Sequence, residues 1–167
     1  MAKKTMKTAK AGSRKVARKS AARRAVAKRA AAKPTAASGG SGLRSAAPSF
    51  TVNDLDKSMA WYRDVLGFAV KQRWENEGRL VGAEMTAGGV TFNLGQDDWK
   101  MGRDRQKGQG VRMYVMTDPQ IDRVADRIKA RGGTLAQEPK DDWGMRAFSL
   151  EDPDGYKITF YTPLKKR

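Results

Sequence analysis

The sequence contains neither cysteine nor histidine among its 167 residues. The absence of cysteine excludes disulfide bonds, thiolate chemistry and zinc sites built on cysteine. The absence of histidine removes the commonest metal ligand and the commonest general base near neutral pH. Any reaction that depends on one of these side chains is therefore excluded, and a metal site would have to be built from oxygen donors.

Long apolar runs are also missing from this chain. No segment approaches the roughly 18 consecutive apolar residues that a membrane-spanning helix needs. The first residues lack the apolar segment of a secretory signal. We therefore expect a cytoplasmic protein that does not enter a membrane, with association with the nucleoid or targeting to an organelle as alternatives.

Acidic residues are absent from the first part of the chain. Residues 1–46 contain 14 Lys and Arg and no Asp or Glu, so the net charge of +16 belongs almost wholly to this segment. Its apolar residues are mostly alanine, which bury too little area to offset the entropy of ordering. We predict a disordered basic tail with a Gly/Ser linker over residues 1–46, followed by one domain over residues 47–164.

The basic tail is similar to the Ala/Lys-rich tails of linker histones and bacterial histone-like proteins. Cations without competing carboxylates bind phosphates by releasing condensed counterions, which gives affinity independent of base sequence. We expect nonspecific DNA or RNA binding through these residues: Lys3, Lys4, Lys7, Lys10, Arg14, Lys15, Arg18, Lys19, Arg23, Arg24, Lys28 and Arg29. A solvated charge run and an organelle-targeting segment remain alternatives.

The domain consists of two segments with the same predicted order of elements. Each begins with an extended run, continues with an amphipathic helix that ends at glycine, and closes with three strand-like runs separated by turns. In the second segment the first of these runs covers residues 134–138, and residues 152–155 form a tight turn between the last two. The first predicted helix begins after Asn53 or Asp54, and the second is capped by Thr117 or Asp118 with Pro119 in its first turn. The order βαβββ, repeated once, predicts an α+β fold with a curved eight-stranded mixed sheet around a cleft.

Two motifs carry a resemblance to a known family. Residues 52–68, VNDLDKSMAWYRDVLGF, resemble the opening motif of the vicinal-oxygen-chelate superfamily, and Asp152-Pro153-Asp154-Gly155-Tyr156 resembles its closing motif. This superfamily includes glyoxalases, bleomycin-resistance proteins and extradiol dioxygenases. The resemblance implies paired βαβββ modules and a tendency to form homodimers. It fixes the fold more closely than the function, because one fold supports many chemistries.

The family's metal site takes one side chain from each of four strands, typically His, Glu, His and Glu. By position these ligands correspond to Ala47, Asn93, Arg112 and Thr159 in this chain. Two neutral oxygens and a cation are poor ligands for a divalent metal. The resemblance therefore implies a metal-independent protein that binds and sequesters a small molecule, with no cofactor. A glyoxalase- or dioxygenase-like lyase or isomerase with a non-standard site is the alternative.

A ligand without a metal must be held by polar and aromatic side chains. The candidate ligand-binding residues are Asn93, Arg112, Tyr114, Thr159, Trp74 and Tyr161. Arg112 can pair with a carboxylate or phosphate, Asn93 and Thr159 can form hydrogen bonds, and the aromatic rings, together with Trp143, can stack on a planar ligand. A salt bridge from Arg112 to a strand carboxylate such as Glu84 is the structural alternative.

The charged linker between the two segments holds a further candidate. Asp97 and Asp98 are adjacent carboxylates followed by Trp99 and, a few residues later, by Arg103-Asp104-Arg105. Such a pair can bind a cation or act as an acid/base pair. A mobile charged loop is the alternative interpretation.

Overall fold

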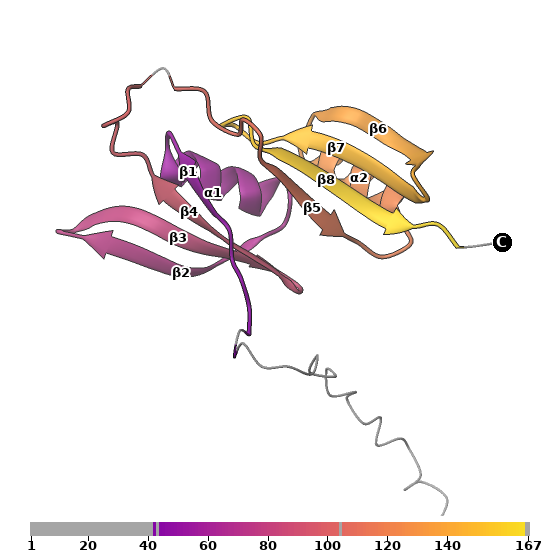
Figure 1. Cartoon of the computed structure of the whole chain (residues 1–167), viewed down its shortest axis with the longest axis horizontal. Coiled ribbons are helices and arrows are strands. Elements are labelled where there is room, and N and C mark those ends of the chain that lie inside the picture. Colours follow the sequence, from indigo (N-terminus) through magenta and orange to yellow (C-terminus); the bar gives the residue numbers. More distant parts are fainter. Residues whose placement is uncertain (1–41, 43, 104, 166–167) are drawn as a thin grey trace, which may run out of the picture. The chain divides into compact units, whose positions relative to one another are not determined.

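The computed structural model describes residues 42, 44–103 and 105–165, which form an α+β domain. Its elements along the chain are β1 (Ser49–Val52), α1 (Leu55–Asp64), β2 (Ala69–Asn76), β3 (Arg79–Ala87), β4 (Val90–Gln96), β5 (Arg112–Met116), α2 (Ile121–Ala130), β6 (Leu135–Asp142), β7 (Met145–Glu151) and β8 (Lys157–Pro163). The predicted repeat of βαβββ is confirmed (Figure 1).

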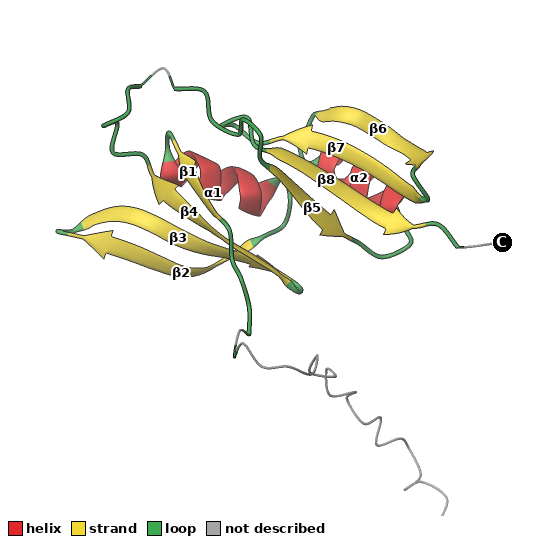
Figure 2. Cartoon of the chain, in the orientation of Figure 1, coloured by secondary structure: helices red, strands yellow, loops and turns green. Residues whose placement is uncertain are grey.

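The eight strands form two sheets of four. The strand orders are β1-β4-β3-β2 and β5-β8-β7-β6, so both modules have the same topology. In each sheet the first strand pairs with the last in parallel, and the other pairs are antiparallel. Hydrogen bonding therefore divides the predicted mixed sheet into two, and each half packs one helix against one face (Figure 2).

The two helices begin differently. The carboxylate of Asp54 accepts a hydrogen bond from the N–H of Lys57 at 3.0 Å, which confirms one of the two predicted N-caps. The second helix starts later than predicted, after Gln120. The carboxylate of Asp118 accepts from the N–H of Gln120 at 3.1 Å, so it stabilises a turn that precedes the helix rather than the helix itself.

Strand β6 is longer than the sequence predicted. The predicted strand ended at Glu138, but β6 continues through Pro139 to Asp142. Proline is tolerated here because β6 is the edge strand of its sheet and its register against β7 shifts between Gln137 and Lys140. The extension places further polar side chains beside the face described below.

Hydrophobic residues of both modules form one core. Tyr156 follows the turn between β7 and β8, and its ring centroid lies 4.6 Å from that of Phe50 in β1. The Tyr156 hydroxyl donates to the backbone carbonyl of Thr51 at 3.0 Å. The two modules are thus joined by aromatic packing as well as by the connecting chain.

A buried carboxylate completes the junction between the modules. Asp152 accepts hydrogen bonds from the Tyr62 hydroxyl at 2.9 Å and from the N–H groups of Asp154 and Tyr156 at 2.9 and 2.8 Å. Burial raises the pKa of Asp152, and these hydrogen bonds oppose that rise. Burial and the neighbouring carboxylate also raise the pKa of Tyr62, so its hydroxyl remains a donor.

The second aspartate of the same turn reaches the start of α1. Asp154 accepts from the N–H of Asn53 at 2.8 Å and from the Ser58 hydroxyl at 3.0 Å. A carboxylate at this position also interacts favourably with the helix dipole. The motif predicted as a tight turn therefore fastens the second module to the first helix.

Two further expectations concern membrane insertion and the basic tail. Within the described residues, no helix is both long and apolar enough to span a lipid bilayer. The basic residues expected to bind nucleic acid, from Lys3 to Arg29, lie outside the described residues.

Candidate functional site

One face of the second sheet is open. Alternation along β5 directs Val115 into the core and leaves Tyr114 exposed. Alternation along β8 directs Ile158 into the core and leaves Tyr161 half-buried on the opposite face. Arg112 and Thr159 share the open face, since their side chains are hydrogen-bonded. Two neighbouring parallel strands thus bring a cation, a hydroxyl and aromatic rings together.

A cavity of about 420 Å³ lies over this face. Its lining residues are Arg112, Tyr114, Gln137, Lys140, Asp142, Trp143, Met145, Ala147 and Thr159. Three of the predicted ligand-binding residues, Arg112, Tyr114 and Thr159, therefore line one cavity. Sequence reasoning missed Lys140 and Asp142, because the predicted strand stopped before the proline that precedes them.

The guanidinium of Arg112 is the central cation of this face. Its Nη1 donates to Oγ1 of Thr159 at 3.1 Å. Among the described residues no carboxylate forms an ion pair with Arg112. The alternative partner Glu84 instead accepts from Lys71 at 2.7 Å. The remaining donors of Arg112 are therefore available to an anion.

Exposed aromatic rings border the cavity. Tyr114 is 61% exposed, and its ring meets the ring of Tyr161 edge to face at a centroid distance of 6.2 Å. Trp143, at the tip of the β6–β7 hairpin, is 91% exposed and has a φ of 50°. An exposed indole contributes little to the core, and a non-glycine residue rarely adopts a left-handed backbone conformation. Both observations favour a role for the Trp143 ring as a contact surface over a role in the core.

Two predicted residues belong to the other sheet. Asn93 lies in β4 opposite Glu84, and Trp74 lies in β2. The Trp74 ring covers Gly82, where an added Cβ would come within 2.8 Å of it. Neither residue lines the cavity of the second sheet. Asn93 is a candidate through its family position and Trp74 through its aromatic ring, and neither property determines on which sheet a residue lies.

The positions that hold a metal in the family do not suit one here. Arg112 places a fixed positive charge where a ligand would stand, and it donates to the hydroxyl of Thr159, the neighbouring position. Asn93 offers a single neutral oxygen from the first sheet, and Ala47 offers no side-chain donor. Across the part of the chain that the structure describes, no three acidic side chains cluster in a way that could bind a metal.

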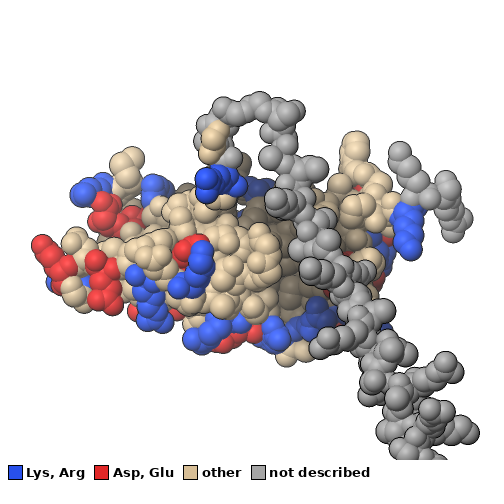
Figure 3. Space-filling model, turned by 90° about the horizontal axis from the view of Figure 1, so that it is seen from below, with Lys and Arg blue, Asp and Glu red and all other residues tan. Residues whose placement is uncertain are grey.

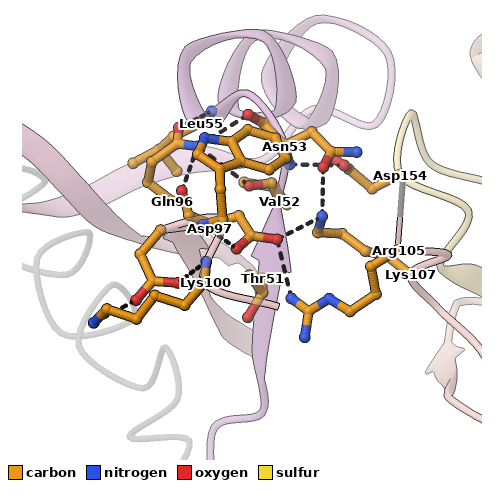
Figure 4. A network of polar contacts seen from close by, with 12 residues as sticks. Thr51, Val52, Asn53, Leu55, Gln96, Asp97, Lys100, Arg105, Lys107 and Asp154 are labelled. Atoms are coloured by element: carbon orange, nitrogen blue, oxygen red, sulfur yellow. Dashed lines mark hydrogen bonds and ion pairs between the residues drawn. The ribbon is translucent and has the colours of Figure 1, made fainter. Parts of the chain in front are cut away.

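The adjacent carboxylates of the linker, Asp97 and Asp98, form ion pairs with different partners. Asp97 Oδ2 contacts Lys107 Nζ at 2.7 Å and the Arg105 guanidinium at 3.0 Å, and both partners of the first pair are almost fully buried (Figure 4). Asp98 is exposed and pairs with Lys100 at 2.9 Å. The two carboxylates therefore do not form an acid/base pair, and Asp97 has a structural role.

Lys107 extends this network towards the first module. Its ammonium also donates to the side chain of Asn53, whose backbone N–H binds Asp154 (Figure 4). Gly108 follows directly and packs so closely on Gly155 that a Cβ would lie 2.2 Å from the carbonyl oxygen of that residue. The linker is thus pinned a few residues before Arg112, which fixes the start of β5.

Comparisons with known proteins agree with this architecture. Residues 44–160 match the model of the Glyoxalase/Bleomycin resistance protein/Dioxygenase superfamily. A probable lactoylglutathione lyase from Synechocystis sp. is 30% identical over 128 residues, covering 70% of this chain and 92% of the relative. A glyoxalase/bleomycin resistance protein/dioxygenase from Nocardioides shares the fold with a TM-score of 0.60 at 20% identity, covering 75% and 87% of the two chains. TnmS3, an antibiotic binding protein from Streptomyces sp. CB03234, has a TM-score of 0.54 at 24% identity, covering 72% and 97%.

The Asp97 network generates a prediction about acid stability. Hydrogen bonds from Lys107 and from the N–H of Trp99 lower the pKa of Asp97 to about 2. A carboxyl group with a lowered folded-state pKa stabilises the fold above its ordinary pKa, and that stabilisation is lost as pH falls towards 2. In urea unfolding from pH 2 to pH 6, we expect Asp97→Asn to be least stable relative to wild type at pH 5–6. The difference should shrink as pH falls.

The neighbouring variant Asp98→Asn serves as the matched control. Its ion pair with Lys100 is exposed, so solvent screens it and the variant should differ little from wild type. A stability difference between Asp97→Asn and wild type that stays constant from pH 6 to pH 2 would contradict the assigned ion pair.

Proposed function

The chain belongs to the glyoxalase/bleomycin resistance protein/dioxygenase superfamily, and from this premise we propose that its domain binds a planar, anionic small molecule without a metal. The observation that carries the proposal is the guanidinium of Arg112, which faces an aromatic cavity and has no carboxylate partner among the described residues. The positive charge stands where relatives of this fold place a metal ligand, and it provides the attraction for an anion directly.

The cavity supplies both kinds of contact that such a ligand needs. Arg112 and Thr159 can bind the two oxygens of a carboxylate, since a guanidinium presents parallel N–H donors. Tyr114 and Trp143 offer ring faces on which a planar group can stack. A volume of about 420 Å³ is within the range of small-molecule sites.

Binding is favoured over catalysis by the titratable groups of the cavity. Lys140 and Asp142 are its other charged residues, and they lie 3.6 Å apart as a solvated pair. Both side chains are about half exposed, so neither lies in the desolvated environment in which general bases are usually held. The lactoylglutathione lyases among the relatives keep a lyase or isomerase activity open as the alternative. The antibiotic binding protein TnmS3 shares the fold and provides a precedent for sequestration.

We further propose that the tail binds nucleic acid without sequence preference. Residues 1–46 contain 14 Lys and Arg and no Asp or Glu that could compete with phosphates for them. The domain lacks a comparable excess of charge, and basic and acidic side chains are interspersed on the face seen in Figure 3. Electrostatic attraction to phosphates would therefore come from the tail.

A homodimer is the third part of the proposal. Met116, the last residue of β5, is 64% exposed and is not among the residues that line the ligand cavity. Pairing of two copies would remove this apolar side chain from water. It would also bring two tails together, which raises avidity for nucleic acid.

Removal of Arg112 tests the binding site. With 1-naphthoate as the probe, we expect Arg112→Ala to weaken binding about 10- to 100-fold, because a hydrogen bond to a charged group contributes roughly 1.5–3 kcal/mol. Isothermal titration calorimetry measures the change. The control is Arg79→Gln, an exposed arginine on β3 that lines none of the cavities around Arg112. Equal affinity in Arg112→Ala and wild type would overturn the site.

Deletion of residues 2–42 tests the tail. Full-length protein should shift duplex DNA in a gel at low salt, with an apparent affinity that falls steeply and log-linearly as salt rises. The deletion should abolish the shift, and so should replacement of the tail's Lys and Arg by Gln at unchanged length. Retention of the shift by either variant shows that the domain, not the tail, binds DNA.

Sedimentation velocity tests the pairing of two copies. We expect a dimer at micromolar concentration for wild type and a shift towards monomer for Met116→Lys, because a charge on the covered surface must be desolvated. The matched control is Val81→Lys, which changes an exposed apolar residue of the first sheet. Wild-type protein that sediments only as a monomer would contradict the proposal.

A further inference from the structure

A second cation lies beside Arg112. The registers of β5 and β8 pair Arg112 directly with Lys157, so two positive side chains occupy neighbouring positions on parallel strands. Like charges at such positions destabilise a sheet unless an anion compensates them. Both residues line two smaller cavities, of about 170 and 260 Å³, that adjoin the main cavity at Arg112.

One acidic side chain lies close to this pair of cations. Glu151 pairs with Lys157 across β7 and β8, and its carboxylate forms an ion pair with Lys157 Nζ at 3.9 Å. This distance is too long for a hydrogen bond, and both side chains are about half exposed. The Lys157 ammonium therefore keeps its donors available. Glu151 lines the smaller of the two cavities but not the larger one.

A glycine-rich turn forms the other wall of the larger cavity. Gly108, Gln109 and Gly110 line it together with Arg112 and Lys157, and both glycines have a φ of 71°. The close packing of Gly108 on Gly155 explains why Gly108 has no side chain, whereas the space around Gly110 is open. Consecutive backbone N–H groups in turns with left-handed residues form concave anion sites.

We propose that Arg112, Lys157 and this glycine turn form a subsite for a phosphate dianion, so that the ligand is a phosphate monoester of a planar aromatic group. The inference rests on the proposed function, because the ring occupies the cavity at Tyr114 and Trp143. Two neighbouring cations match two negative charges better than the single charge of a carboxylate. Arg112 lines all three cavities and joins the ring site to the phosphate site.

The test compares three probes with the same ring on full-length protein at pH 8, namely 1-naphthyl phosphate, 1-naphthoate and 1-naphthol. We expect the phosphate to bind at least 10-fold more tightly than the carboxylate. The advantage should shrink at pH 5, where the phosphate monoester carries a single charge because its second pKa is about 6.

Two variants with opposite expected effects on phosphate binding distinguish the subsite from general effects on folding. Lys157→Met should remove most of the advantage of the phosphate over the carboxylate and leave naphthoate binding within about twofold. Glu151→Gln should strengthen phosphate binding, because it removes a competing carboxylate. Lys57→Gln, an exposed lysine on α1 that lines none of the three cavities, should change nothing.

The outcomes distinguish the subsite from the ring site. Equal affinities for the phosphate and the carboxylate, with no effect of Lys157→Met or Glu151→Gln, would overturn the phosphate subsite and leave the ring site standing. Failure of every naphthyl probe to bind would overturn both. A gain for Glu151→Gln and a loss for Lys157→Met, specific to the phosphate, would support the subsite.

Discussion

The arrangement of the two modules depends on the hydrogen bonds that the buried carboxylate of Asp152 accepts. It accepts from a hydroxyl of the first helix and from two N–H groups of its own turn, while Asp154 of the same turn reaches the start of that helix. Removing a buried acceptor of this kind leaves several donors without partners, which costs more than the net value of the bonds. The turn therefore sets where β8 begins, and with it Lys157 and Thr159.

The pinned linker fixes the other strand of the site in a comparable way. The buried pair of Asp97 and Lys107 and the close packing of Gly108 on Gly155 lie just before β5. Since β5 and β8 pair in parallel, positioning both of their first residues sets the register that places Arg112 next to Lys157. A rigid scaffold of this type keeps a binding face pre-organised, which reduces the entropy lost when a ligand binds.

Sequence reasoning predicted the repeated βαβββ order and the turn at residues 152–155, because hydrophobic periodicity and turn residues act locally. It did not predict that Asp152 and Asp154 bind the first helix, since that contact spans about a hundred residues. Family position suggested Asn93, Arg112 and Thr159, and aromatic character suggested Tyr114 and Trp74. Arg112, Tyr114 and Thr159 line one cavity, whereas Asn93 and Trp74 lie on the other sheet. Lys157 was missed, because only the strand register reveals its neighbour.

The cation of Arg112, in place of a metal ligand, attracts the anion in the proposed site. This role is tested most directly by titrating 1-naphthoate into protein stripped of metals with a chelator, and then into the same protein supplied with zinc, nickel, manganese or iron. We expect the same dissociation constant in every case, because the charge that attracts the anion belongs to Arg112. Loss of binding in the stripped protein, restored by one of these metals held tightly in the cavity, would contradict it.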